Sequence, residues 1–86
     1  MPGSRGHFVY IVRCVDGTLY TGYARDPQAR QIVHNSGRGA KYTSGRRPVT
    51  LIYVERFRSK RRALRREIEI KKWTRKRKEL LCGGKP

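Results

Sequence analysis

The turn at residues 15–17 (Val-Asp-Gly) constrains the fold of this chain more than any other feature, because it joins two strand-like segments. Residues 7–14 (HFVYIVRC) and 18–23 (TLYTGY) are rich in β-branched and aromatic side chains. Such segments on either side of an Asp-Gly pair predict an antiparallel β-hairpin. The length of the turn sets which residues pair, and therefore which side chains share a face.

Two turn lengths are compatible with the sequence, and they differ in where they place Tyr10 and Tyr20. A two-residue Asp-Gly turn would put the two tyrosines on opposite faces of the hairpin. A three-residue loop with Gly17 in the left-handed conformation would pair Cys14 with Thr18 and put both tyrosines on one face. Aspartate is favoured before a left-handed glycine, so we expect the three-residue loop.

This register gives the hairpin two faces of different character. On the first face a glycine lies opposite a tyrosine and leaves room for its ring; its residues are Tyr10, Val12, Tyr20 and Gly22. The second face is apolar, and we expect it to pack on the core; its residues are Val9, Ile11, Leu19 and Tyr23.

A helix is expected directly after the hairpin. Asp26 can cap it, Pro27 suits its first turn, and Gly37 follows its end. Arg30 and His34 lie one turn apart on the flank of its apolar stripe, so both could face the tyrosines. Taken alone, each of the two is equally compatible with an ordinary solvent-facing helix residue. The expected apolar stripe consists of Ala29, Ile32 and Val33.

Residues 36–48 (SGRGAKYTSGRRP) contain three glycines and four cations, and we expect a loop that builds no core. Such a segment can follow a phosphate backbone and stack an aromatic ring on a base, although an ordinary basic surface loop has the same composition. The candidate nucleic-acid-binding residues are Arg38, Lys41, Tyr42, Arg46 and Arg47.

The remaining elements are a third strand and two helices. Residues 49–57 (VTLIYVERF) predict a strand, and their continuous apolar run is typical of a central strand buried on both faces. Ser59 is the expected cap of a helix that runs to about Lys72. Thr74 is the expected cap of a last, basic helix that covers the sheet, with Trp73 packed at the junction.

Glu67 is the acidic side chain that the helical periodicity directs towards the core. It lies in the middle of the apolar face of its helix. A carboxylate there is costly unless a cation, hydrogen bonds or a metal receive it. A buried ion pair with an arginine is therefore the alternative to a metal site. The face consists of Ala63, Leu64, Ile68 and Ile70.

The other five acids are expected to have simpler roles. Asp16 belongs to the turn, Asp26 to a helix cap, Glu69 and Glu79 to solvated helix faces, and Glu55 to a strand of undetermined facing. Any metal would then be held by one protein carboxylate, which suits Mg²⁺, since this ion keeps waters and takes other ligands from substrate phosphate. The sequence offers neither an aspartate pair for two metals nor a histidine cluster for zinc.

Charge and length limit the classes of function. The 86 residues contain 22 Lys and Arg against 6 Asp and Glu, a formal charge of +16, which indicates a polyanionic partner such as nucleic acid. A disordered or ribosome-associated basic protein is the alternative, but 36% hydrophobic content in regular patterns favours a folded core. No continuous apolar span is present, so we do not expect a membrane protein.

Domain limits and location follow from the same considerations. We expect one domain at residues 7–82 between disordered tails at 1–6 and 83–86. Cys14 and Cys82 lack metal-ligand spacing and fit a reduced compartment, so we expect a cytoplasmic protein. Association with the nucleoid is compatible with this location. A monomer is favoured, and no protein partner can be named.

The motifs in this order resemble the GIY-YIG nuclease family over roughly residues 8–81. The first motif is present as Phe8-Val9-Tyr10, with phenylalanine in place of the family's first glycine, and the second as Tyr20-Thr21-Gly22. HNSGRGAKYTSGRRPVTLIY and ALRREIEIKKW supply further agreement. The chain is most similar to small single-domain bacterial members, and next to the nuclease subunit of the Slx structure-specific endonuclease.

The resemblance implies a fold and a set of roles. The fold would be α+β, a three-stranded, mostly antiparallel sheet flanked by about three helices. One of the two tyrosines would activate water, with Tyr10 the first choice and Tyr20 the alternative; His34 would orient that water, and Arg30 would hold the scissile phosphate. Glu67 would bind Mg²⁺ or Mn²⁺. The implied function is a metal-dependent DNA endonuclease, structure-specific and of the repair or recombination type. The alternative is a nucleic-acid-binding protein that keeps the fold but has little or no activity.

Overall fold

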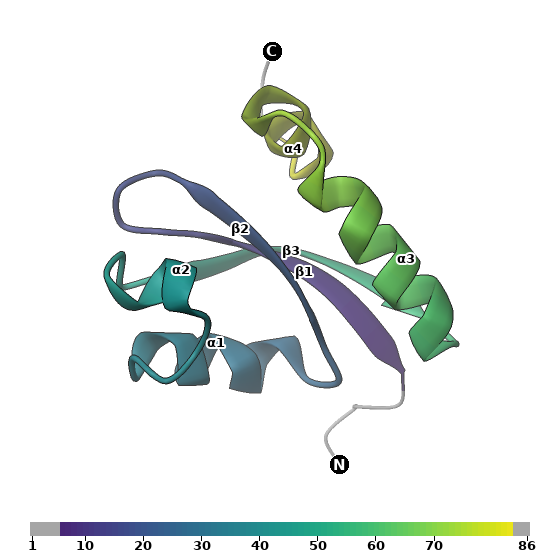
Figure 1. Ribbon diagram of the computed structural model, residues 1–86, viewed down its shortest axis with the longest axis horizontal. Helices are drawn as coiled ribbons and strands as arrows, with labels where there is room; N and C mark the ends of the chain where they lie inside the picture. Colours follow the sequence, from purple (N-terminus) through teal and green to yellow (C-terminus); the bar gives the residue numbers. More distant parts are fainter. Residues whose placement is uncertain (1–5, 84–86) are drawn as a thin grey trace.

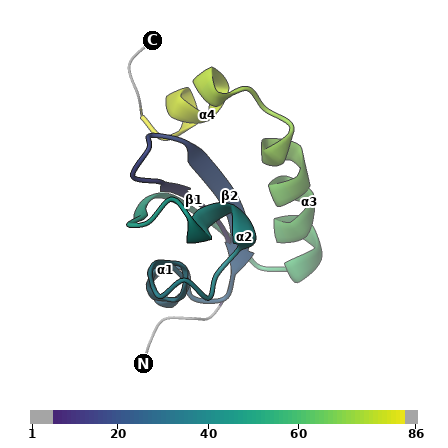
Figure 2. The same cartoon turned by 60° about the vertical axis from the view of Figure 1, so that its left-hand side comes forward.

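The computed structural model describes residues 6–83 as a three-stranded antiparallel sheet with helices on both faces. Figures 1 and 2 show α1 and α2 on one side of the sheet and α3 on the other. This confirms the expected α+β class. The expected tails lie almost entirely outside the described residues. The elements are β1 (His7–Arg13), β2 (Leu19–Ala24), α1 (Pro27–Asn35), α2 (Lys41–Ser44), β3 (Thr50–Phe57), α3 (Lys60–Lys71) and α4 (Arg75–Leu81).

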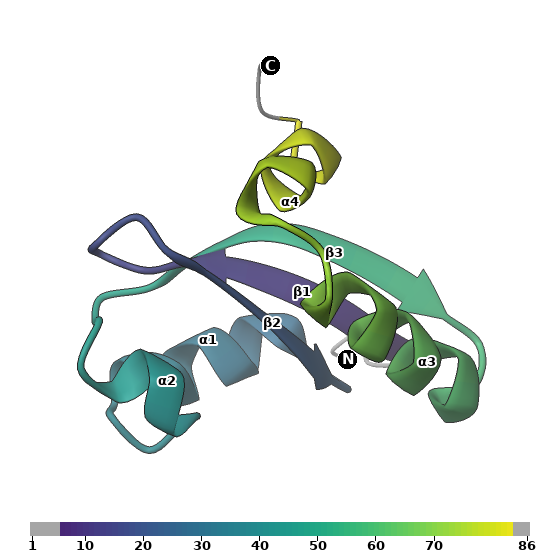
Figure 3. The same ribbon diagram turned by 45° about the horizontal axis from the view of Figure 1, so that its top comes forward.

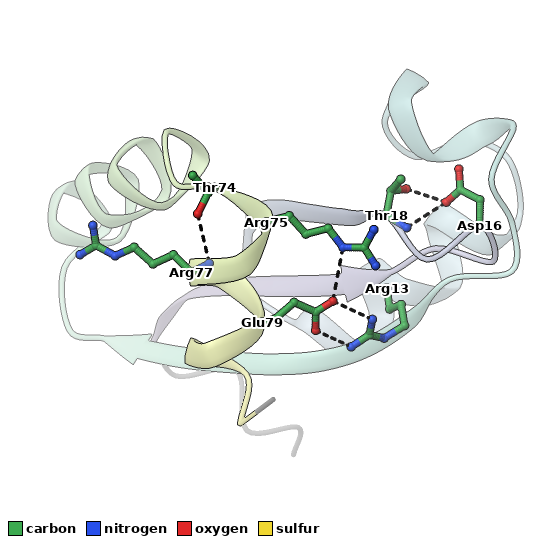
Figure 4. Close-up of polar contacts among 7 residues, drawn as sticks. All are labelled: Arg13, Asp16, Thr18, Thr74, Arg75, Arg77 and Glu79. Carbon is green, nitrogen blue, oxygen red and sulfur yellow. Dashed lines mark hydrogen bonds and ion pairs between the residues drawn. The ribbon is translucent and has the colours of Figure 1, made fainter. Parts of the chain in front are cut away.

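The turn between β1 and β2 is the expected three-residue loop. The Cys14 N–H donates to the Thr18 carbonyl at 2.8 Å, and the Gly17 N–H donates to the Cys14 carbonyl at 2.9 Å. Gly17 has a φ of 87°, in the left-handed region that favours glycine. Asp16 accepts hydrogen bonds from both the backbone N–H and the hydroxyl of Thr18, which rigidifies the loop (Figure 4). The resulting register pairs Tyr10 with Gly22, as predicted.

The two faces of the sheet have separate cores. On the α3 face the strand residues are Val9, Ile11 and Leu19, which pack with Ala63 and Ile70 of the helix. On the α1 face the buried residues are Tyr10, Val12, Cys14, Ala24 and Val49. The expected apolar face of the hairpin is therefore confirmed, while the tyrosine face has a core of its own.

The central strand is β1, so the expectation that the third strand lies in the centre was wrong. The strand order is β2-β1-β3, and Figure 3 shows β3 at the edge of the sheet. Val54 of β3 remains 39% exposed, whereas Val9 and Ile11 are fully buried. A short continuous apolar run occurs in both kinds of strand, and only the pairing partners separate them.

The inner face of α1 is polar, so the predicted stripe of Ala29, Ile32 and Val33 was wrong. Ala29 is exposed and Ile32 is 69% exposed, while His34 is fully buried. Asn35 of the same helix exchanges two hydrogen bonds with the backbone of Val49, at 2.7 and 3.1 Å. Polar side chains can be buried when each has a partner, and these satisfy backbone groups beside the edge strand.

The connection between α1 and β3 is more ordered than the expected loop. Residues Lys41–Ser44 form the short helix α2, and the side chain of Thr43 is fully buried. The glycines correctly indicated turns on both sides of this helix. Thr43 of this helix contacts His34 of α1 at 2.8 Å, a tertiary contact that no local pattern reveals.

The two C-terminal helices begin as predicted. The Ser59 and Thr74 hydroxyls cap α3 and α4, by accepting from the N–H groups of Arg62 and Arg77. Trp73 packs against the core at the junction, as predicted. Two details of the expected helix faces were wrong, since Ile68 is 56% exposed and Glu79 is half-buried in ion pairs. None of the helices within residues 6–83 is long and apolar enough to cross a lipid bilayer.

The close approach of Gly22 to Tyr10 leads to a prediction about the stability of the fold. A Cβ atom at Gly22 would lie 2.5 Å from Tyr10 Cζ, so the ring would have to move. We expect Gly22→Ala to lower the free energy of unfolding by about 1–3 kcal/mol, as overpacking does elsewhere. Gly45→Ala is the matched control, because no atom lies within 4 Å of its added methyl group. Urea denaturation measures both, and equal stabilities would contradict the packed position of the Tyr10 ring.

Candidate active site

The centre of the candidate site is a hydrogen bond between Tyr10 of β1 and His34 of α1. The Tyr10 hydroxyl lies 2.7 Å from His34 Nε2, and both side chains are buried. Gly22 on β2 provides the space for the phenol. The bond therefore joins the central strand to the first helix across the tyrosine face of the sheet.

Thr43 of α2 extends this bond on the other side of the imidazole. Its hydroxyl donates to the Ala40 carbonyl at 2.9 Å and lies 2.8 Å from His34 Nδ1. The Ala40 N–H is also directed at Nδ1, at 3.4 Å. Either ring nitrogen of a neutral imidazole can carry the proton. In one tautomer Nε2 accepts from the Tyr10 hydroxyl, and in the other it donates to that hydroxyl.

The environment keeps both members of the central pair neutral near pH 7. Burial, followed by the nearby Tyr20, raises the pKa of Tyr10 to about 12, while Arg30 opposes this shift. Burial, followed by the positive charge of Arg30, lowers the pKa of His34 below its ordinary value. Tyr10 is thus a neutral phenol and His34 a neutral imidazole.

Tyr20 and Arg30 complete this face of the site. The Tyr20 ring centroid lies 6.5 Å from that of Tyr10 and 5.4 Å from that of His34, in tilted and edge-on geometries. Tyr20 is only partly buried. Arg30 is close enough to both Tyr10 and His34 to change their pKa values. The structure therefore brings together all four predicted site residues of the hairpin and α1.

Glu67 approaches these residues from the opposite side. It lies on α3, which packs on the other face of the sheet, yet its charge contributes to the raised pKa of Tyr10. Its side chain is 16% exposed and forms an ion pair of 3.2 Å with Lys71, not with an arginine. The Lys71 Nζ atom lies 5.7 Å from the centroid of the Tyr20 ring. Glu67 and Lys71 therefore reach the site beside the edge strand β2.

A metal at this position would have one carboxylate from the protein. Within residues 6–83, no three His, Cys, Asp or Glu side chains are grouped so that they could hold a metal ion together. A single carboxylate fits Mg²⁺ or Mn²⁺ that takes its remaining ligands from water and phosphate. The Lys71 ammonium lies 3.2 Å from this carboxylate, so a metal bound by Glu67 would replace this ion pair.

The predicted nucleic-acid-binding residues all lie on the connection that includes α2, but their surroundings differ. Tyr42 stacks on Tyr20 with ring centroids 5.7 Å apart. Arg46 is used within the fold, because it pairs with Asp16 at 3.0 Å and lies over the Tyr42 ring. Arg47 donates to backbone carbonyls of Ser44 and Asn35. Arg38 and Lys41 are exposed.

Three further residues belong to the site although sequence patterns did not single them out. The Thr43 hydroxyl lies 2.8 Å from His34 Nδ1, and Lys71 pairs with Glu67. Gly39 allows the chain to pass His34, since an added Cβ would lie 2.8 Å from its Cα. The position of Lys71 one helical turn after Glu67 is a usable signal for an ion pair. Nothing local distinguishes Thr43 from other threonines.

The buried state of His34 predicts a pH dependence of stability. Its folded pKa lies below the ordinary value of 6.5, so the unfolded chain binds more protons between those two values. The stability it contributes is complete above the unfolded pKa and is lost as pH falls through this window towards the folded pKa. Proton NMR of the two histidine rings should show His34 titrating below its ordinary value, with His7→Gln identifying the resonance. A His34 pKa at or above the ordinary value would contradict the neutral, hydrogen-bonded ring.

Comparisons with known proteins agree with this geometry. Residues 6–80 match the profile of the GIY-YIG catalytic domain. A UPF0213 protein of Staphylococcus epidermidis is 62% identical over 72 residues, which cover 84% of this chain and 88% of the relative. A UPF0213 protein of Staphylococcus aureus is 61% identical over 72 residues, which again cover 84% of this chain and 88% of the relative. The UPF0213 names state no activity.

Two solved structures have the same fold. The solution NMR structure of a UPF0213 protein from Bacillus halodurans has a TM-score of 0.59 and 47% identity, covering 91% of this chain and 83% of that one. The solution NMR structure of a protein from E. faecalis has a TM-score of 0.63 and 43% identity, covering 94% of this chain and 86% of that one. Because residues 6–80 match this domain, and because its paired tyrosines face an arginine and a histidine, this chain belongs to the GIY-YIG family, among the small UPF0213 proteins.

Proposed function

We propose that this protein is a divalent-metal-dependent endonuclease that hydrolyses phosphodiester bonds in structured or damaged DNA. The observation that carries the proposal is the convergence of Tyr10, Tyr20, Arg30 and His34 on one face of the sheet, at distances of direct contact for the central pair. Membership of a catalytic-domain family of nucleases supports a hydrolytic reaction on nucleic acid. The protein would act in the bacterial cytoplasm, in repair or recombination, as a monomer on the nucleoid.

The Tyr10–His34 pair is the proposed proton acceptor. A phenol with a pKa of about 12 is a poor base by itself. Tyr10 would take a proton from the attacking water as its own proton passes to His34 Nε2, so that no separate phenolate has to form. This relay uses the tautomer in which Nε2 is unprotonated and the Nδ1–H donates to Thr43. Tyr20, which is partly exposed, orients the same water.

Arg30 and Glu67 would neutralise the phosphate charge in different ways, Arg30 directly and Glu67 through a metal. Arg30 offers a planar guanidinium that binds phosphate oxygens in pairs, and it stabilises the charge that develops during attack. Glu67 would hold Mg²⁺ or Mn²⁺, with Lys71 moving away from the carboxylate as the metal and phosphate enter. A bound divalent metal supplies Lewis-acid neutralisation of the phosphate and the leaving oxygen.

The Glu67–Lys71 ion pair also favours a second candidate function. If this pair persists in the presence of nucleic acid, the carboxylate is not available to a metal. The protein would then bind nucleic acid with the same basic surface but cleave it slowly or not at all. Neutralising Glu67 distinguishes these two functions.

Glu67→Gln should remove DNA nicking while preserving the fold. We expect the rate to fall by about a hundredfold or more, the equivalent of roughly 2.7 kcal/mol of transition-state stabilisation. The melting temperature should change little, since the Lys71 side chain is 47% exposed and water can solvate it after the exchange. The measurement is Mg²⁺-dependent nicking of labelled duplex, flap and junction DNA, together with thermal unfolding.

Glu69→Gln is the matched control, because Glu69 lies on the same helix and its side chain is 55% exposed. It should leave nicking unchanged. A large loss of melting temperature in Glu67→Gln without metal would assign Glu67 to folding. Equal nicking by wild type and Glu67→Gln would remove the carboxylate from the mechanism.

Binding of DNA should weaken steeply with salt. A chain with a formal charge of +16 displaces several counterions at once, so the logarithm of affinity should fall linearly with the logarithm of salt concentration. Lys41→Ala and Arg38→Ala should each reduce the slope by about one, because both side chains are exposed on the connection before β3. Fluorescence anisotropy over a salt series measures this, and a slope near zero would contradict a polyanionic substrate.

A further inference from the structure

A pocket of about 210 Å³ lies between the hairpin turn, α2 and α4, next to the candidate active site. Typical sites for drug-sized molecules have roughly 300–1,000 Å³, so this pocket has room for a single planar ring rather than a larger ligand. Its walls combine two aromatic rings with two cations. A guanidinium already lies over each ring, Arg77 over Trp73 at 3.9 Å and Arg46 over Tyr42 at 4.2 Å from the centroid, so these two ring faces are not open to a ligand. The lining residues are Thr18, Leu19, Tyr42, Trp73, Arg75 and Lys78.

The cations of the pocket are poorly neutralised by the protein. Lys78 is half-buried and forms no hydrogen bond or ion pair with any side chain in the part of the chain that the structure describes. Burial, and then repulsion by Lys71, lowers the pKa of its amine. Arg75 reaches Glu79 at 3.5 Å, but both oxygens of that carboxylate are taken by Arg13 at 3.0 and 3.2 Å (Figure 4). A half-buried amine without a counter-ion is stabilised when an anion enters beside it.

The pocket is joined to the candidate active site through one aromatic stack. Tyr42 lines the pocket and stacks on Tyr20, whose ring in turn lies beside Tyr10 and His34. Lys71, which repels Lys78, is the same residue that pairs with Glu67. A strand whose scissile phosphate lies at the active site would therefore reach this pocket with an adjoining nucleotide.

We propose that this pocket binds one nucleotide of the substrate strand next to the scissile phosphate, with the base at the edges of the Trp73 and Tyr42 rings and the phosphate between Lys78 and Arg75. This rests on the proposed function for the position of the cleaved bond. A pocket that holds one ring accepts a base only when the base has left the duplex stack. The protein then selects DNA with an unpaired nucleotide beside the cleavage point, such as a flap, a gap or a junction.

The chain contains a reporter for this site, because Trp73 is its only tryptophan. The experiment titrates metal-free protein at low salt with thymidine 5′-monophosphate, with thymidine, and with inorganic phosphate, while Trp73 fluorescence is followed. We expect saturable quenching by the nucleotide. Thymidine and phosphate should each bind roughly tenfold or more weakly, because each lacks one half of the contacts.

The variant is Lys78→Met, which keeps the apolar stem of the side chain and removes the charge. It should weaken binding of the nucleotide by roughly tenfold. Lys76→Met is the matched control, since Lys76 is exposed on the same helix and does not line the pocket. The control should bind like the wild type. Equal weakening in both variants would show only a general effect of charge and would overturn the proposal.

The two proposals can fail separately. Binding of the nucleotide needs no metal and no cleavage, so Glu67→Gln should bind it as the wild type does, even when nicking is lost. Absence of saturable quenching, or equal affinity for inorganic phosphate, would overturn the nucleotide site whatever the nicking assays show. Normal nucleotide binding without any nicking in the wild type would retain the site and reject the endonuclease.

Discussion

The hydrogen bond between the buried Tyr10 and the buried His34 is the interaction on which this side of the structure depends. A buried phenol or imidazole without a partner would destabilise the fold by roughly 1–3 kcal/mol, so the central strand and the first helix must meet where both are satisfied. Thr43 extends the same requirement to the connection after α1. Gly22 makes the arrangement possible, because any side chain there would collide with the phenol. The packing of the core and the proposed chemistry therefore require the same placement of Tyr10 and His34.

The distribution of charge follows from a shortage of acids. All six carboxylates have partners inside the chain, including the turn at Asp16, the helix cap at Asp26 and the guanidinium groups around Glu55, Glu69 and Glu79. Within residues 6–83 the six acids cannot neutralise the much larger number of lysines and arginines, and the full sequence has a formal excess of +16. The excess of positive charge favours a polyanionic partner. One of these cations, the half-buried Lys78, lines a pocket together with the aromatic rings of Tyr42 and Trp73. The Tyr42–Tyr20 stack connects this basic pocket to the tyrosine face of the sheet.

Local signals predicted the hairpin and the helix caps well. Asp16 and Gly17 set a three-residue turn because the hydrogen bonds and the left-handed φ lie within the turn itself. Ser59 and Thr74 capped their helices for the same reason. The apolar stripe of α1 and the central place of the third strand were predicted wrongly. Hydrophobic periodicity assumes that the inner face is apolar, whereas α1 buries a face whose polar groups all find partners.

The sequence by itself determined the family, the register that puts Tyr10 and Tyr20 on one face, and the residue types available for chemistry. These depend on short-range turn geometry and on residue order, both of which are local. Only the tertiary structure decided that Thr43 is a partner of His34 Nδ1, that Lys71 is the partner of Glu67, and that Glu67 lies on the helix at the opposite face of the sheet. It also placed Trp73 and Lys78 beside Tyr42, more than thirty positions earlier in the chain. Such contacts depend on how separate elements pack, and no local propensity encodes which distant side chain will fill a given space.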